Sequence, residues 1–484
     1  MDIALKNKLN PSRFLAFFCI IGTIIFIAGC ASSSIFLPYP TQAAAYKTGL
    51  NNSKLESSLQ KLDKKRTSSD KVLYLMERGR LNQLSNNFDE SLDDFKTVIE
   101  QFNLQDDKAR VTATGSMNVG SSLLTNDNAI PYKGDAYERV LVYHYQAMNY
   151  LAKGDRSAAL VEVRRANPEQ NFALQQHERE LAKAEKEAEK KQPASEPGQY
   201  DNYFSSMDQM ASKVKSSFQN AYTFYLSGLI YEANGNYNDA YIDYKKAIEI
   251  FPGNPYLQDD VLRLAKQLGM RDDLRRYNKL FEPKAARNSS STHADTPGAN
   301  TGTLVIIYEH GYVSQKQEIS LPLFTSQGLQ QVSFPVYKQA WSQPPPLKIS
   351  VNNLELKSST IVYASALAVK ALKEKIPGMI IRQTLRAIAK KELQNQANEQ
   401  GGAISFTTQI YNLISERADL RSWLTLPNDV QIARIELKTG QKNNIQFATT
   451  SQSENIEIDI RPGQITILRL TDTGTRIIKQ LIPL

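Results

Sequence analysis

One stretch, residues 221–255, limits the fold more than any other part of this 484-residue chain. Its apolar residues recur with helical spacing on both sides of a Gly-Asn turn, which predicts two amphipathic helices packed as a hairpin. Gly228 and Ala240 occupy the two small-residue positions of a tetratricopeptide unit, which repeats about every 34 residues. Pro252 stands where the second helix must end, because its ring cannot continue the hydrogen-bond ladder.

A single helical hairpin has an apolar face that it cannot bury alone, so we expect neighbouring repeats. Weaker versions of the pattern occur at residues 73–102, with Gly79, and at residues 140–168, with Ala147. An insertion separates the second repeat from the third. The alternative is a set of unrelated amphipathic hairpins that share small residues by chance. The repeat interpretation predicts an all-α tetratricopeptide-like domain over residues 43–282, a scaffold and not a site of chemistry.

The repeat pattern also predicts which side chains face a partner. Tetratricopeptide domains present the inner face of each first helix to a protein or peptide. For His144 the alternative is a packing histidine inside the core. The predicted partner-binding residues of the third repeat are Tyr222, Tyr225, Leu229 and Glu232, and those of the second are Leu141, His144, Met148 and Leu151.

A polar, glycine-containing insert at residues 106–137 interrupts the repeat rhythm. A long insert between helical hairpins is either a binding loop or a plug packed onto the repeats. Tyr132 offers a rigid amphipathic ring to a partner, and Pro131 and Gly134 fix a turn beside it. In the plug interpretation, the Asn and Asp side chains serve as turn and cap residues. The binding hypothesis names Asn126, Asp127, Asn128, Tyr132 and Arg139.

The first residues carry a targeting signal. Basic residues precede an apolar run at residues 14–28, which is short for a membrane span and suits a secretory signal. Ile-Ala-Gly-Cys at residues 27–30 matches the lipobox of bacterial lipoproteins, so we expect cleavage after Gly29 and lipid attachment at Cys30. The alternative is an uncleaved anchor helix, with Cys30 an ordinary thiol. Ala31 follows in place of an Asp retention signal, which predicts the outer membrane of a Gram-negative cell, with residues 30–42 as the tether.

The net charge and the cysteine content indicate which kinds of partner to expect and how the mature chain is stabilised. The net charge of +8 falls to +6 once residues 1–29 are removed, and the basic residues are spread along the chain. A periplasmic protein does not meet nucleic acid, so we expect membrane lipid at the N-terminus and an envelope protein or peptide as partners. The only other cysteine, Cys19, lies in the signal, and the mature chain must therefore be stable without disulfides.

The second half of the chain changes its periodicity. Residues 283–302 have no apolar face and predict a linker, where we expect a broad protease to cut first. Beyond it, residues 303–484 alternate with the period of strands and include helical stretches at 364–375, 377–401 and 404–423. We therefore predict a multidomain protein, in which an α+β domain with an antiparallel sheet or sandwich and inserted helices follows the helical repeats.

Catalytic signatures do not appear in the sequence. It has no phosphate-binding loop, dinucleotide-binding glycine triad, nucleophile elbow or HExxH motif. With four histidines we expect no metal site, no cofactor and no catalytic residue. Arg382, Arg386 and Lys390 form one basic helix edge, either a contact for phosphate head groups or a solvated side. Residues 416–423 combine Trp423 with several charges, either as a partner hot spot or as a packed corner.

Four blocks of sequence resemble an uncharacterised family of Gram-negative outer-membrane lipoproteins with tetratricopeptide-like repeats. The blocks are LLTNDNAIPYKGDAYERVLVYHYQAMNYLAKGD at 123–155, EVRRAN at 162–167, VIIYEHG at 305–311 and ERADLRSWLTLP at 416–427. The resemblance implies a role in the cell envelope and supplies no catalytic residues.

Two functions follow. The first is a non-enzymatic, lipid-anchored adaptor whose repeats bind an envelope protein or peptide. The alternative is an envelope enzyme acting on a glycan through the C-terminal domain, which requires a pair of carboxylates in a cleft. The candidates for that pair are Glu309, Glu416 and Asp419.

Overall fold

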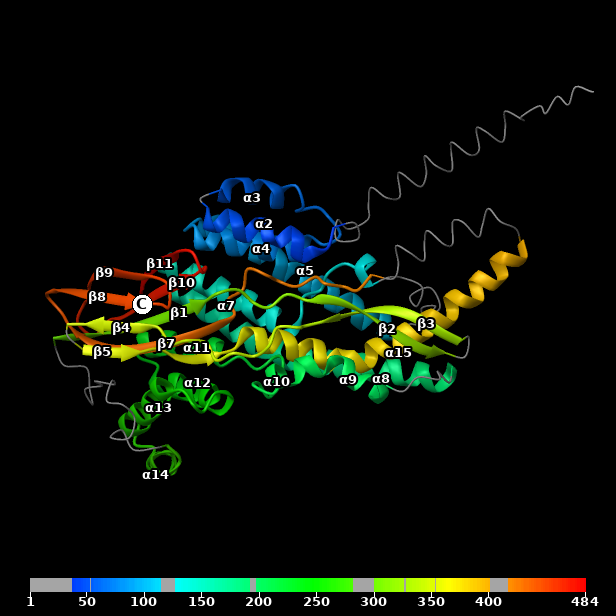
Figure 1. The fold of residues 1–484 in the computed structure, drawn as a ribbon. Coiled ribbons are helices and arrows are strands. Elements are labelled where there is room, and N and C mark those ends of the chain that lie inside the picture. Colours follow the sequence, from blue (N-terminus) through cyan, green and yellow to red (C-terminus); the bar gives the residue numbers. More distant parts are fainter. Residues whose placement is uncertain are drawn as a thin grey trace, which may run out of the picture.

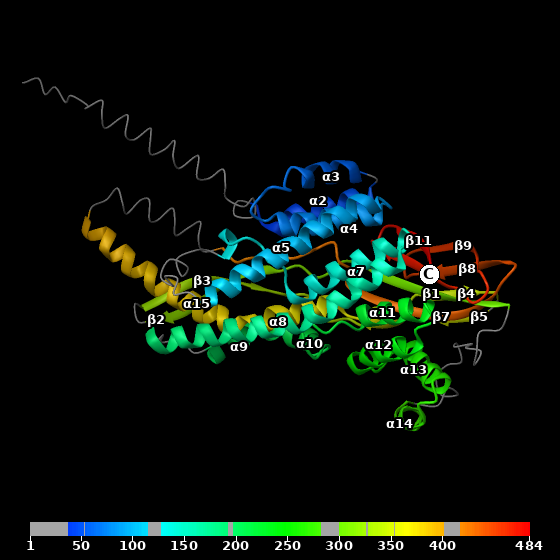
Figure 2. The same ribbon diagram turned by 180° about the vertical axis from the view of Figure 1, so that it is seen from behind.

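A computed structural model describes residues 37–52, 54–114, 127–191, 197–281, 300–325, 328–352, 354–400 and 417–484. The chain forms an elongated molecule in which a helical half packs along a sheet-rich half (Figure 1). The view from behind shows the same order of layers (Figure 2). None of the described helices combines the length and the apolar character needed to cross a bilayer.

The helical half consists of antiparallel hairpins. The hairpins α4–α5, α7–α8 and α11–α12 correspond to the three predicted repeats. Its elements are α2 (Tyr39–Asn51), α3 (Leu55–Asp63), α4 (Lys71–Leu84), α5 (Phe88–Thr114), η1 (Asp127–Ala129), α7 (Ala136–Ala152), α8 (Arg156–Lys191), η2 (Pro197–Tyr200), α9 (Asp201–Phe204), η3 (Ser205–Met207), α10 (Asp208–Ala211), α11 (Ala221–Ala233), α12 (Tyr237–Ile250), α13 (Pro255–Gln267) and α14 (Arg271–Leu280).

The other half contains three sheets. The largest has the order β11-β10-β1-β7-β6, with β1 and β10 parallel and its other neighbours antiparallel. A four-stranded antiparallel sheet has the order β5-β4-β8-β9, and β2 and β3 form a separate hairpin. The elements are β1 (Thr301–His310), β2 (Gln317–Thr325), β3 (Gly328–Val336), β4 (Lys348–Val351), β5 (Leu354–Lys357), β6 (Ser359–Val362), α15 (Ala364–Gln400), β7 (Asp429–Lys438), β8 (Lys442–Ala448), β9 (Ser453–Asp459), β10 (Ile465–Asp472) and β11 (Ile477–Pro483).

The predicted fold class is confirmed: helical repeats precede an α+β part with antiparallel sheets. Several element boundaries are wrong. Pro377 was expected to separate two helices, but it lies inside the continuous helix α15. The helix α8 also continues through Pro168, the last residue of the second repeat stretch. The described part of the predicted 404–423 helix, residues 417–423, is neither helix nor strand. α5 extends to Thr114, well into the predicted insert.

The predicted boundary between the halves remains a prediction. α14 ends at Leu280 and β1 begins at Thr301, while residues 282–299 lie outside the described part. Likewise, the predicted signal and Cys30 precede the described residues, and α2 begins at Tyr39, slightly before the predicted end of the tether.

The small residues of the repeats allow their helices to approach closely. A Cβ added at Gly228 would lie 2.4 Å from Cε1 of Tyr244, and one at Gly79 would lie 2.7 Å from Cε1 of Phe95. The aromatic ring of each second helix therefore rests on the glycine of the first. This is the packing that the spacing of Gly228 and Tyr244 predicts.

We expect Gly228→Ala to lower the free energy of unfolding by about 1–2 kcal/mol, because overpacking the Tyr244 ring costs more than the better helix propensity of alanine returns. The midpoint of urea unfolding measures this loss. Gly253→Ala is the matched control, since a Cβ there meets no atom within 4 Å. Equal midpoints for the two variants would contradict the close helix approach.

Candidate functional site

An extended segment of the C-terminal half lies in the groove of the repeat helices. Residues 417–428, which we call the threaded segment, run without regular secondary structure beside α4, α5 and α7 before β7 begins (Figure 1). Trp423, Leu424 and Leu426 are fully buried. Part of the C-terminal half is therefore packed against the repeat helices.

Two buried glutamates of the helices hold the main chain of the threaded segment. Glu138 on α7 accepts the backbone N–H of Trp423 at 2.7 Å. Glu77 on α4 accepts the N–H of Leu424 at 2.8 Å and also the Thr425 hydroxyl. These N–H groups are buried without strand partners, so leaving them unpaired would cost free energy. Carboxylates thus take the place of a neighbouring strand.

Glu138 gathers several further donors around its carboxylate. It accepts hydrogen bonds from the Tyr132 hydroxyl at 2.6 Å, the Tyr137 hydroxyl at 3.1 Å and the Asp135 backbone N–H at 2.8 Å. Burial and the nearby Asp135 raise the pKa of Glu138 to about 7, whereas the donors favour its ionised form. Burial likewise raises the pKa of Glu77.

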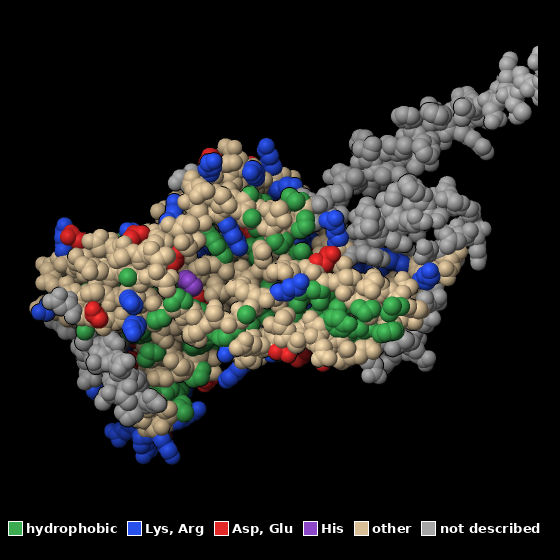
Figure 3. All heavy atoms as spheres, viewed as in Figure 1, with side chains coloured by type: hydrophobic (Ala, Val, Ile, Leu, Met, Phe, Trp, Pro, Cys, Tyr) green, Lys and Arg blue, Asp and Glu red, His purple; other side chains and the backbone are tan. Residues whose placement is uncertain are grey.

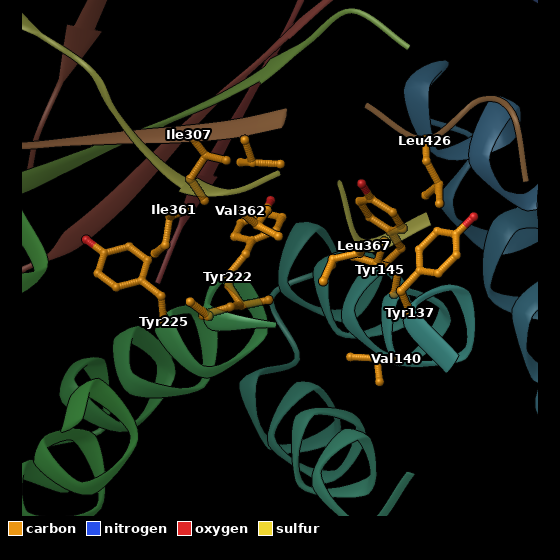
Figure 4. Packing of buried hydrophobic residues seen from close by; sticks show 14 of the residues in the cluster. Tyr137, Val140, Tyr145, Tyr222, Tyr225, Ile307, Ile361, Val362, Leu367 and Leu426 are labelled. Carbon is orange, nitrogen blue, oxygen red and sulfur yellow. The ribbon is translucent and has the colours of Figure 1, made fainter. Parts of the chain in front are cut away.

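The side chain of Trp423 fixes the register of the threaded segment. Its ring packs edge-on against Phe95 of α5 and Tyr145 of α7, with centroids 5.8 Å apart in both pairs. Its Nε1 donates to the Thr425 hydroxyl at 3.1 Å. Leu426 lies opposite Tyr137 and Tyr145 (Figure 4). The segment therefore has both a main-chain and a side-chain anchor.

The insert before α7 packs around Arg421. Arg421 pairs with Asp70 at 2.6 Å and with Asp419 at 2.8 Å. It also donates to the backbone carbonyls of Asp127 and Ile130 at 2.8 and 2.9 Å. Although burial opposes it, the two carboxylates raise the pKa of Arg421. Residues 127–130 of the insert thus pack onto the threaded segment.

This geometry corrects the exposure expected for the insert. Asn128 is buried and donates to the carbonyls of Arg417 and Ala418, and Tyr132 is buried against Glu138. Arg139 is buried and pairs with Asp106 and Glu169. The Asp127 side chain pairs with Arg386 at 3.1 Å, and Asn126 lies outside the described residues.

The inner face of the third repeat is also covered. Tyr222, Tyr225 and Leu229 are fully buried, and the two tyrosines point toward Ile307, Ile361 and Val362 of the large sheet (Figure 4). They do not face an open groove.

Glu232, the last predicted partner residue of this repeat, is an ion-pair centre. Its carboxylate contacts Arg434 of β7 and Arg263 of α13, both at 2.8 Å. Arg434 also pairs with Asp260 at 2.9 Å. Burial opposes ionisation, but the two arginines hold the pKa of Glu232 well below its usual range. This buried cluster ties α11 and α13 to the large sheet.

The second repeat shows the same pattern. Leu141, His144, Met148 and Leu151 are all buried. The His144 ring lies 3.9 Å from the ring of Tyr222 and 5.3 Å from that of Tyr145. Within the described residues, neither ring nitrogen has a hydrogen-bond partner. Burial and the positive charge of Arg80 lower the pKa of His144 to about 3, so the ring is neutral.

A neutral buried histidine predicts a specific loss of stability in acid. Below pH 6.5 the unfolded chain binds a proton at this position and the folded chain does not, so stability falls as the pH falls. We expect His144→Phe to remove this penalty, so that its stability relative to the parent improves by about 2 kcal/mol between pH 7.5 and pH 5. Urea midpoints at both pH values measure the change, and a difference that is independent of pH would contradict a neutral His144.

A third buried cluster lies between the two halves and involves Glu309 of β1. Its carboxylate contacts Arg80 of α4 at 2.5 Å and Arg469 of β10 at 2.9 Å. It also accepts the Thr471 hydroxyl at 2.7 Å, and Gln83 accepts from both arginines. Three elements that are far apart in sequence meet at this carboxylate.

The carboxylates proposed for an enzyme are thus engaged elsewhere. Glu309 is enclosed by two arginines, Asp419 is paired with Arg421, and Glu416 lies outside the described residues. These contacts give the alternative glycan enzyme no support. The described residues contain no group of three or more His, Cys, Asp or Glu side chains that could hold a metal ion.

Sequence reasoning missed the residues that clamp the threaded segment. Glu77 directly follows the apolar run at residues 72–76, and Glu138 lies shortly before the apolar run at residues 140–143, which is the signal that could have singled them out. For residues 416–423 the packed-corner interpretation agrees with the described contacts of Arg421 and Trp423. No local pattern connects Glu138 to Trp423, 285 residues away, or Glu77 to Leu424, 347 residues away.

The comparisons with known proteins agree with the repeat architecture. A family model, the tetratricopeptide repeat, matches residues 221–254, which are α11, α12 and their surroundings. No curated protein matches the chain. The chain therefore contains a tetratricopeptide repeat, a module typical of protein–protein interaction and scaffolding.

Proposed function

We propose that this protein is a lipid-anchored scaffold of the Gram-negative cell envelope, held at the periplasmic face of the outer membrane, that binds an envelope protein or peptide through its repeats. The lipobox ending at Cys30 supports the anchor, and the resemblance to envelope lipoproteins supports the compartment. The tetratricopeptide repeat supports a protein partner.

The threaded segment is the observation that carries this proposal. Glu77 and Glu138 accept hydrogen bonds from backbone N–H groups of the threaded segment, while the indole of Trp423 packs between Phe95 and Tyr145. This is a way to hold a peptide that needs few specific side chains. The described inner positions of the repeats are covered by other parts of the same chain. A partner therefore binds the outer face of the repeats, unless the two halves separate and uncover the inner face.

A photo-cross-linking residue can test where the partner binds. On the outer face of the third repeat, Ile242 of α12 is about half exposed. We expect a light-dependent protein adduct in intact cells when the photoreactive residue replaces Ile242. Glu457 of β9, which is also exposed, is the matched position on the sheet half. The absence of an adduct at residue 242, or the same adduct at residue 457, would contradict a partner on the repeats.

The anchor has its own test. Cys30→Ser should leave a slower-migrating precursor that incorporates no radioactive palmitate, because the thiol accepts the lipid before cleavage. Labelling that continues in this variant would refute lipid attachment at Cys30.

A further inference from the structure

The β2–β3 hairpin stands apart from the other sheets, and Glu318 near the start of β2 is the single charged residue in its two strands. Residues 319–337 contain no Asp, Glu, Lys or Arg, in a chain with 22% charged residues. β2 and β3 pair only with each other among the described strands. Exposed edge strands are usually protected by charged side chains, and here they are not. Exposed apolar side chains at an end of a hairpin that has no charged residue are typical of an interaction surface.

The apolar side chains of the hairpin divide between its two faces. Leu321, Leu323 and Phe334 are buried, and Phe334 packs edge-on against Phe204 at 6.0 Å between centroids. Phe324 and Leu329 face the other way and form a cross-strand pair next to the turn. Their exposed fractions are 55% and 56%.

A third exposed side chain, that of Tyr203, lies near this pair. The backbone N–H of Phe324 donates to the Tyr200 hydroxyl at 3.3 Å, and the ring of Tyr203 lies 6.4 Å from that of Tyr200. Tyr203 is 49% exposed. Figure 3 shows hydrophobic side chains gathered over the hairpin. We call Phe324, Leu329 and Tyr203 the hairpin patch.

The neighbouring helix adds positive charge. α15 packs on β2 and β3 and continues past them (Figure 1). Residues 380–391 of α15 contain four basic residues and no acidic one, and Arg382 and Lys391 are partly exposed. Positive charge beside an apolar tip suits the surface of a membrane with anionic lipids.

The N-terminal attachment brings this region close to the membrane. Only seven residues lead from Cys30 to Leu37, where the described structure begins, and their reach is at most about 25 Å. The start of α2 lies toward the same end of the molecule as the hairpin (Figures 1 and 2). An anchored chain therefore keeps the hairpin end near the bilayer, while the four-stranded sheet points away from it.

We propose that the hairpin patch inserts into the outer-membrane lipid at the boundary between head groups and acyl chains. Phe324 and Leu329 leave water without any charge having to be desolvated. The depth is limited to this boundary, because the N–H and C=O groups of the strand edges need water or head groups as partners. The lipid contact fixes the orientation of the body, so that the repeats face the periplasm.

Spin labels on the full-length protein test the insertion. Leu329→Cys carries a nitroxide at the patch, and Gln441→Cys carries one in the turn before β8, which lies at the opposite end of the molecule (Figure 1). The proteins are reconstituted in vesicles of phosphatidylethanolamine and phosphatidylglycerol, and a protein without the introduced cysteine supplies the background. The rate at which each nitroxide collides with oxygen, which is enriched in the bilayer, is compared with the rate at which it collides with a water-soluble nickel complex.

We expect the label at residue 329 to collide several-fold more often with oxygen than with the nickel complex. The label at residue 441 should collide more often with the nickel complex. A label at residue 329 that meets the nickel complex as readily as the label at 441 overturns the insertion. Dipolar broadening between labels at residue 329 also overturns it, because a second copy would then cover the patch. Phe324→Cys, labelled in the same way, repeats the measurement if Leu329→Cys does not fold.

The insertion of the hairpin patch rests on the membrane attachment in the proposed function. Separate experiments can refute the lipid attachment and the insertion. A Cys30 that takes no palmitate removes the lipid anchor. A water-exposed label at residue 329 removes the hairpin contact, however the N-terminus is held.

Discussion

Glu309→Ala is expected to destabilise the protein by about 3–5 kcal/mol, because it leaves buried guanidinium groups without their counter-charge. Glu309, Arg80 and Arg469 are all essentially inaccessible to solvent. Burial opposes the charge of Arg80, and Glu309 is what keeps its pKa raised. The measurement is the free energy of unfolding in urea, provided that its slope against urea concentration, the m value, is the same in variant and parent.

An exposed ion pair supplies the control for this experiment. Lys442 and Glu457 of neighbouring strands are 3.1 Å apart with side chains 78% and 60% exposed. We expect Glu457→Ala to change stability by less than about 1 kcal/mol, since exposed pairs are worth little. A Glu309→Ala variant as stable as Glu457→Ala would show that Arg80 and Arg469 find other partners or water.

Trp423→Ala is the second substitution with a large expected effect, a loss of about 3–5 kcal/mol. The indole fills the space between Phe95 and Tyr145, and its removal opens a cavity in the groove of the repeat helices. The main-chain contacts with Glu77 and Glu138 remain possible, so the threaded segment can stay in place. The urea midpoint again measures the loss.

Added indole separates a cavity from a collapsed groove. If the pocket persists in Trp423→Ala, indole should bind it and recover about 1.4 kcal/mol at ten times its Kd. The parent protein, whose pocket is filled, should not respond. A variant that loses little stability, or whose loss indole does not reduce at any concentration, would contradict a pocket built around Trp423.

The repeat hairpins and most strands could be predicted because their signals are local. Gly228 and Ala240 stand at fixed positions of one unit, and the period of two along residues 317–324 follows from the alternation within the single strand β2. Helix ends were less predictable. Pro377 is tolerated inside α15, whose packing against α7, α8 and α10 outweighs the lost hydrogen bond.

The candidate site could not be predicted to the same extent, since it depends on contacts between distant parts of the chain. The predicted inner positions of the repeats, such as Tyr222 and His144, are buried, and the sequence does not say what covers them. Here residues of the large sheet lie next to Tyr222 and Tyr225 (Figure 4). Partner binding through these inner residues stays a prediction, and it requires the two halves to separate.

Cleavage of the chain between its halves tests most directly whether the repeat helices hold the α+β half as part of one folded unit. A site for a specific protease placed within residues 283–299 allows a single cut outside the described contacts. After complete cleavage, size-exclusion chromatography under native conditions should show both fragments eluting together at the mass of the uncut protein. The buried pairs between Arg80 and Glu309, and between Glu232 and Arg434, together with the threaded segment, would hold them. Two fragments that elute separately, each folded and at its own mass, would contradict a groove filled by the chain itself.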